Sequence, residues 1–151
     1  MLSSVKMDLG WIVMSPKIAS NQQPRSLYEQ VKKGNVLEKA CPSREVLRDV
    51  TNRWGVLAIL ALTEETLRFS ELRRKISGIS EKMLSQTLQS LEADGFVNRI
   101  AYPVVPPHVE YSLTPMGEEV SSRIRDLTGW IEDNLSTIML HRAEYSQNIA
   151  K

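Results

Sequence analysis

Polar side chains between residues 80 and 91 have the types and spacing that the recognition of DNA base edges requires. At about 100° per residue in a helix, Lys82, Gln86 and Gln89 share one face. The opposite face is apolar, and its residues are Leu84, Leu88 and Leu91. Glutamine amides match the donor and acceptor of adenine, and lysine matches guanine or a phosphate. The pattern predicts a helix that anchors one face in a core and presents the other to a nucleic acid.

Positive charge lies on both sides of this segment. Arg73, Arg74 and Lys75 precede it and are placed to meet backbone phosphates, whereas Arg99 and His108 follow it. Solvated helix faces are often equally basic, so a merely solvated surface stays open as the alternative. The residues that we expect to contact DNA are Ser70, Arg73, Arg74, Lys75, Ser80, Lys82, Met83, Ser85, Gln86, Gln89, Arg99 and His108.

The sequence contains one cysteine, Cys41, so an intramolecular disulfide and a multi-cysteine metal site are excluded. Cys41 lies directly before a helix start and close to Lys39 and Arg44, and these features favour the reactive thiolate. Free cysteine is also among the most buried residue types, so a packing role stays open beside redox sensing. A one-cysteine redox enzyme is a third, weaker hypothesis.

Other catalytic and metal-binding patterns are missing from the sequence. Its two histidines, His108 and His141, do not lie at ligand spacing from another histidine, a cysteine or a pair of acidic residues. The sequence also lacks a glycine-rich phosphate loop and a nucleophile elbow. We therefore expect a protein that is not an enzyme and has no metal or other cofactor.

Helices must position these side chains, because residues 43–102 contain no proline. Apolar spacing predicts a helix pair over residues 43–62, with Ser43 as N-cap and a break at Thr51-Asn52. A short helix then begins at a Ser70 cap. After a Ser77-Gly78 turn, a longer helix with a Ser80 cap runs to Gly95. Each is too short to be stable alone, so tertiary packing must hold them.

The later part of the chain predicts two strands and a helix. Residues 96–102 and 109–113 alternate and are rich in β-branched or aromatic side chains, which favours a hairpin with a proline-rich tip. Thr114-Pro115 is a strong helix start. An apolar stripe then indicates one long helix packed on another. The stripe consists of Val120, Ile124, Leu127, Ile131, Leu135 and Ile138.

Composition gives 19 Lys and Arg against 18 Asp and Glu in 151 residues, a net charge of +1. A DNA-binding domain is expected to be basic, but the average hides where the charges lie. Residues 1–53 hold nine basic against five acidic residues, whereas acidic residues predominate after residue 115. The sequence shows neither a convincing signal peptide nor an apolar stretch of about 18 residues, so we expect a cytoplasmic protein without a membrane partner.

Two short helices, a Ser-Gly turn and a following hairpin predict a mainly α (α+β) fold, a winged helix-turn-helix. The sequence also resembles the HxlR-type family of bacterial winged helix-turn-helix regulators from about Cys41 to Leu135. The resemblance rests on Cys-Pro before the first helix, FSELRR, ISEKML, and YPVVPPHVEYSLTPMG. It implies a dimeric transcription factor that binds double-stranded DNA through a pseudo-palindromic operator.

The resemblance also implies where the subunits meet. The terminal helices would form the dimer contact, from a helix over Ser26–Glu38 and from the long C-terminal helix. The expected interface residues are Leu27, Val31, Val120, Ile124, Leu127, Ile131, Leu135 and Ile138. In some family members the cysteine that Cys41 matches senses oxidants or electrophiles, so an oxidant or small-molecule effector is an open partner.

The expected organisation has three parts. Residues 1–25 form a poorly ordered arm, residues 26–141 the winged helix-turn-helix domain with flanking dimerisation helices, and residues 142–151 a C-terminal tail. In the functional hypothesis, a recognition helix over about 80–94 enters the major groove and a wing over about 98–112 lies on the backbone or in the minor groove. The alternative is a winged-helix protein-interaction module that does not bind DNA.

Overall fold

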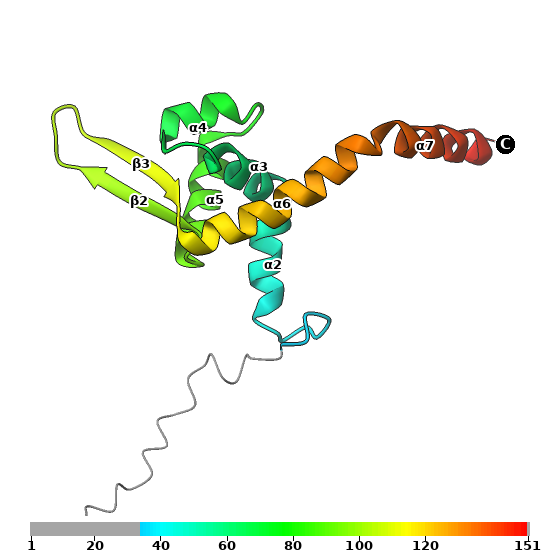
Figure 1. The fold of residues 1–151 in the computed structure, drawn as a ribbon, viewed down its shortest axis with the longest axis horizontal. Helices are drawn as coiled ribbons and strands as arrows, with labels where there is room; N and C mark the ends of the chain where they lie inside the picture. Colours follow the sequence, from blue (N-terminus) through cyan, green and yellow to red (C-terminus); the bar gives the residue numbers. More distant parts are fainter. Residues whose placement is uncertain (1–33, 151) are drawn as a thin grey trace, which may run out of the picture. The chain divides into compact units, whose positions relative to one another are not determined.

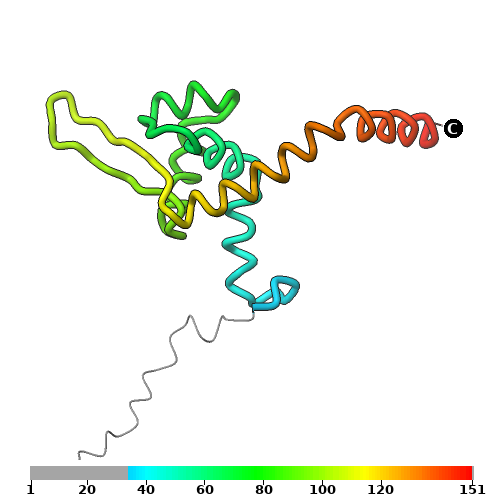
Figure 2. The backbone as a smooth tube through the Cα atoms, viewed as in Figure 1, coloured from blue at the N-terminus to red at the C-terminus, as the bar shows by residue number. Residues whose placement is uncertain are grey.

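The computed structural model describes residues 34–150, in which helices and a small antiparallel sheet follow one another (Figure 1). The helices are α2 (Ser43–Thr51), α3 (Arg53–Leu62), α4 (Phe69–Lys75), α5 (Glu81–Ala93), α6 (Pro115–Asp133) and α7 (Leu135–Ile149). The strands are β1 (Leu67–Arg68), β2 (Val97–Tyr102) and β3 (His108–Leu113). The β2–β3 hairpin and the α6–α7 segment project in different directions from the helices between them (Figure 2).

The predicted break at Thr51-Asn52 is confirmed, and Asn52 explains it. Its side-chain oxygen accepts the N–H groups of Trp54 and Gly55 at 3.0 and 2.9 Å, which caps α3. Its amide nitrogen donates to the last carbonyls of α2, on Arg48 and Asp49. One side chain therefore satisfies the backbone groups at both helix ends.

The helix-turn-helix is formed by α4 and α5, as the sequence predicts. Between them, Gly78 has a φ of +83°, in the left-handed region that favours glycine. The Ser80 hydroxyl accepts the N–H of Met83 at 3.1 Å, so the predicted Ser80 cap is confirmed. This cap fixes the first turn of the helix that carries the polar face.

Two predicted N-caps are wrong. Pro42 occupies the cap position of α2, so Ser43 is the first helical residue, and its side chain makes no cap hydrogen bond. Helix α4 begins at Phe69, which places Ser70 inside its first turn. The Glu71 carboxylate accepts the Arg68 N–H at 2.7 Å, and this bond starts α4 earlier than a Ser70 cap would.

The sheet has three strands in the order β1-β3-β2, and both pairs are antiparallel. The predicted hairpin is confirmed, with Tyr102 opposite His108 and Val97 opposite Leu113. The sequence did not predict β1, whose Leu67 pairs with Tyr111. Two residues are too few for an alternation pattern, so this strand exists only because β3 provides a partner.

The core lies between the helix-turn-helix, α3, the sheet and the first half of α6. The predicted anchor face of α5 is buried: Leu84, Leu88 and Leu91 expose 2% or less of their surface. They pack in one cluster with Ile59, Leu72 and other apolar residues. Burial of this face fixes which side of α5 stays exposed.

The C-terminal segment is two helices, because a turn at Asn134 separates α6 from α7. The predicted single long helix is therefore corrected to two, and α7 extends through residues 142–149 of the predicted tail. Ile124 is buried in the core of its own chain, and Val120 is partly buried against that core. The exposed part of the stripe begins at Leu127, whose side chain is 57% exposed.

The predicted helix over Ser26–Glu38 lies mostly outside the described residues, as do Leu27 and Val31. Residues 34–40 form turns and irregular backbone, so that helix does not reach Glu38. The predicted arm over residues 1–25 also lies outside the described residues.

Candidate nucleic-acid interface

The exposed face of α5 is the centre of the candidate interface. Lys82, Gln86 and Gln89 are exposed, while the leucines on the opposite side are buried. Met83 is 39% exposed beside Gln86. Ser85 is half-buried, so it can donate only toward one edge of this face. The structure thus leaves amide, ammonium and thioether groups accessible along a single helix.

A hollow of about 520 Å³ lies where α4 meets the first turn of α5. Ser70, Arg73 and Arg74 line it together with Glu81, so the structure brings these predicted contacts to the start of α5. Arg73 forms an ion pair with Glu81. Arg74 makes no ion pair with any described residue, so of the two arginines it is the one whose charge is available to a phosphate.

Lys75 does not join this group. Its ammonium donates to the Ala61 carbonyl at 3.2 Å and to the Glu65 carboxylate at 2.6 Å. It lines a separate hollow beside Leu57 and Leu60 of α3. The expectation that Lys75 acts with Arg73 and Arg74 is therefore not supported by its position.

The hairpin meets α5 at Arg99. A hollow of about 360 Å³ is lined by Arg99 and Tyr111 from the strands and by Ser85 and Gln89 from the helix. Glu92 also lines it, so the arginine faces one carboxylate as well as the polar side of α5. The structure thus places the predicted base of the wing beside the recognition face.

His108 lies on the other face of the hairpin, because side chains alternate along a strand and His108 pairs with Tyr102. Its ring stacks on that of Tyr102, with centroids 4.7 Å apart. Its Nε2 lies 3.3 Å from the Glu110 carboxylate. The charge of Glu110 and a hydrogen bond from the phenol to it raise the pKa of Tyr102. The structure therefore does not bring His108 together with Arg99.

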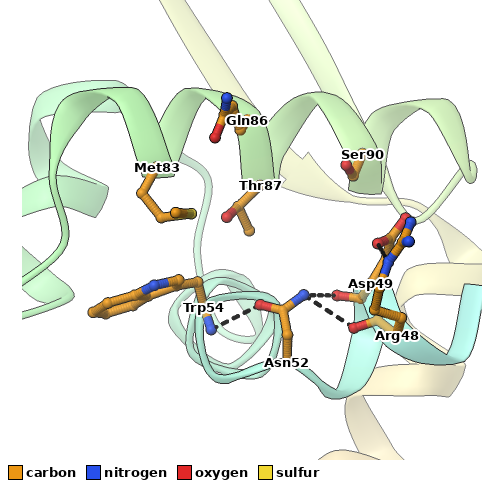
Figure 3. A pocket seen from close by; sticks show the side chains of 8 residues that line it. All are labelled: Arg48, Asp49, Asn52, Trp54, Met83, Gln86, Thr87 and Ser90. Atoms are coloured by element: carbon orange, nitrogen blue, oxygen red, sulfur yellow. Dashed lines mark hydrogen bonds and ion pairs between the residues drawn. The ribbon is translucent and has the colours of Figure 1, made fainter. Parts of the chain in front are cut away.

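A further hollow, which the sequence did not predict, lies between α5 and the α2–α3 corner (Figure 3). Trp54 forms one wall and also packs against the core. The adjacent Arg53 and Trp54 at the start of α3 are the sequence signal that could have indicated this hollow, but a tryptophan within an apolar pattern predicts only packing. Trp130, which also follows helical apolar spacing, is 60% exposed.

Cys41 is 9% exposed and lies outside the main apolar cluster. Its Sγ is 2.8 Å from the Ser43 hydroxyl, and either atom can be the donor. Within residues 34–150, His, Cys, Asp and Glu side chains do not gather in threes as a metal site requires. Among the described helices, none combines the length and apolar character needed to cross a membrane.

A helix-turn-helix whose second helix exposes a polar face, followed by a two-stranded hairpin, defines the winged helix-turn-helix class. Residues 49–139 match the family model of the HxlR-like helix-turn-helix. The chain therefore belongs to this family, and it is a helix-turn-helix transcriptional regulator, not an enzyme.

Known relatives agree with this assignment. The chain is 64% identical to the HTH-type transcriptional regulator YtfH of Escherichia coli over 119 residues, which cover 79% of this chain and 94% of YtfH. Among solved structures, YtfH from Salmonella typhimurium matches with a TM-score of 0.71 and 60% identity, covering 74% of this chain and 99% of that one. The redox regulator HypR in its oxidised form matches with a TM-score of 0.57 and 36% identity, covering 62% and 97%.

Proposed function

We propose that this regulator binds a pseudo-palindromic DNA duplex as a homodimer. Helix α5 of each subunit enters the major groove, and the β2–β3 hairpin lies along the backbone or in the minor groove. The observation that carries the proposal is the division of α5 into a buried leucine face and an exposed face with Lys82, Gln86 and Gln89.

The dimensions of DNA suit this arrangement. A helix with its side chains is about 10–12 Å across, and the major groove is about 12 Å wide. Gln86 and Gln89 can each pair with an adenine edge, and Lys82 with guanine or a phosphate. Arg74 lies at the start of α5, in the hollow toward α4, and Arg99 lies along one side of α5, in the hollow toward the hairpin. Base recognition is thus central, and phosphate contacts flank it.

The homodimer is supported by apolar side chains that the described chain leaves uncovered. On α6, Leu127 and Trp130 are 57% and 60% exposed, and on α7 Leu135 is 50% exposed. No residue of α7 is buried. Exposed apolar surface of this extent indicates a protein contact, and a two-fold dimer would cover it with the same face of a second copy.

Binding to duplexes selected from a random-sequence library tests the proposal. Gln86→Ala should relax preference at one base position, with a loss of about 1–3 kcal/mol. Arg74→Ala should weaken binding to all sequences and lower the salt dependence. A wild-type protein without salt-dependent duplex binding would contradict DNA binding and favour the protein-interaction module.

We further propose that Cys41 makes the regulator responsive to oxidants. The Ser43 hydroxyl beside its Sγ supports a chemical role, although the side chain is buried as a packing residue would be. The likeness to HypR, a redox regulator, supports it as well. Without a second cysteine, oxidation must give a sulfenic acid, a mixed disulfide or a disulfide between the Cys41 residues of two subunits.

The oxidant response can be tested by measuring DNA affinity before and after diamide treatment. Wild-type protein should change its affinity reversibly, with recovery in dithiothreitol, and Cys41→Ser should not respond. An alkylation rate of Cys41 no faster than that of a free thiol, or an equal diamide response in Cys41→Ser, would contradict sensing.

A further inference from the structure

The hollow between α5 and the α2–α3 corner has a volume of about 330 Å³ and is open to solvent. Met83 and Thr87 point from α5 toward the corner, with Trp54 at one end and Arg48 at the other (Figure 3). The start of α3 therefore lies directly alongside the recognition helix.

The two sides of α5 have different neighbours. About 100° per residue places Ser85 and Gln89 on one side of Gln86 and Met83 and Thr87 on the other. The first side faces Arg99 of the hairpin, and the second faces the α2–α3 corner. A helix seated in the major groove has a phosphate backbone along each side. Arg99 can meet one backbone, so the other backbone must pass along the start of α3.

Arg53, the first residue of α3, is the cation at the start of this helix. Its guanidinium carbon lies 4.3 Å from the centroid of the Trp54 ring, so the group is stacked on the indole. Arg53 is exposed and makes no ion pair with any described residue. In contrast, Arg48, which lines the hollow together with Trp54, is paired with Asp49 at 3.1 Å. Stacking restrains the guanidinium plane while its N–H edge stays free to donate.

Backbone amides at the start of α3 cannot replace this side chain. The N–H groups of Trp54 and Gly55 are already donated to the Asn52 side chain. With these two amides occupied, the Arg53 side chain is the main donor for an anion here, and its five N–H donors match the oxygens of a phosphate in a bidentate contact. We propose that the stacked Arg53–Trp54 pair binds a backbone phosphate of the DNA on the side of α5 opposite the hairpin.

This inference rests on the proposed DNA-binding function, and the experiment separates the two. Binding of the full-length protein is measured over a series of salt concentrations on two probes. One is a duplex selected by the wild type from a random library, and the other is a mixed random-sequence duplex of similar length. Circular dichroism and sedimentation confirm that each variant is folded and has the wild-type oligomeric state.

Arg53→Ala should weaken binding to both probes by about tenfold, because binding to the backbone carries no sequence information. The slope of log K against log salt should fall by about 0.9 for each phosphate that the variant no longer neutralises. Arg53→Lys should recover the slope but only part of the affinity, because lysine keeps the charge without the bidentate geometry. Arg123→Ala, an exposed arginine on α6, is the matched control and should leave both quantities unchanged.

Three outcomes would overturn the inference. In the first, Arg53→Ala has the affinity and the salt slope of the wild type. In the second, Arg53→Ala weakens binding only to the selected duplex, which indicates a base contact. In the third, Arg123→Ala has the same effect, which indicates a general effect of reduced charge. In each case wild-type binding still supports the proposed function, whereas a wild type that binds neither probe overturns both.

Discussion

Removal of the Trp130 side chain tests the proposed dimer most directly. Trp130 is 60% exposed on α6, between Leu127 at 57% and Ile131 at 40%, so the described chain leaves much of this apolar surface uncovered. In a two-fold dimer each subunit contributes the same face, so Trp130→Ala removes two indoles from one interface. The variant should therefore dissociate at a much higher concentration than the wild type.

The magnitude follows from the exposed area. A buried aromatic side chain covers roughly 150–250 Å², so 60% exposure leaves about 90–150 Å² available. At ~25 cal/mol per Å² this contributes about 2–4 kcal/mol for each copy and twice that for the dimer. Ordering of side chains on association offsets part of the gain. We expect a loss of at least ~2 kcal/mol, which raises the dimer dissociation constant about 30-fold.

Sedimentation equilibrium over a range of protein concentrations measures this change. Met116→Ala is the control, because Met116 is 47% exposed at the opposite end of the same helix. DNA affinity should fall with dimer stability in Trp130→Ala and stay unchanged in the control. The reasoning fails if Trp130→Ala remains as dimeric as the wild type, or if the wild type is a monomer at micromolar concentrations.

Four further outcomes are expected. Burial, and after it the negative charge of Asp49, raise the pKa of Asp94 above its ordinary value of 3.8. The protonated form of Asp94 therefore contributes stability that is present below pH 3.8 and is lost as the pH rises through the pKa of the folded state. Asp94→Asn should therefore remove that pH-dependent loss, measured as the free energy of urea unfolding between pH 3 and 7. Gly55→Ala should destabilise by about 1–3 kcal/mol or more in the same assay, because a Cβ there would lie 2.0 Å from the Asp49 carbonyl oxygen. Leu88→Ala should cost about 2–5 kcal/mol in melting experiments, since Leu88 is 2% exposed. Lys75→Ala should leave DNA affinity at the wild-type level, because its ammonium binds Ala61 and Glu65; a loss as large as that of Arg74→Ala would contradict this assignment.

Local patterns were sufficient for the helix-turn-helix and the hairpin. The spacing of the leucines on α5, the Ser80 cap and the Gly78 turn depend on residues within a few positions of one another, so they can be interpreted without the fold. The break at Asn52 is local as well, because all four of its backbone partners lie within four residues. The same holds for the predicted Thr114 cap, which accepts the N–H of Gly117.

Three differences from the predictions, those at β1, the Ser70 cap and Lys75, arise because a residue binds either a partner far away in the sequence or a competing neighbour. Strand β1 depends on pairing with β3, more than 40 residues further on. Ser70 is displaced from the cap position by Glu71, which binds the Arg68 amide. Lys75 turns from the predicted phosphate contact to a carbonyl of α3, on Ala61. Charge and spacing alone do not indicate which of several nearby acceptors a flexible side chain chooses.

The sequence by itself determined the helix-turn-helix, the hairpin and the polar face of α5, because helical and strand periodicities assign each residue to a face. Only the tertiary structure decided what covers each apolar face. It divides one continuous stripe into Ile124, buried in its own chain, and Leu127, left exposed for a partner. It also places Trp54, on which Arg53 stacks, beside α5, because the α2–α3 corner packs against that helix. Periodicity shows that a face is apolar, but packing between distant segments determines its neighbour.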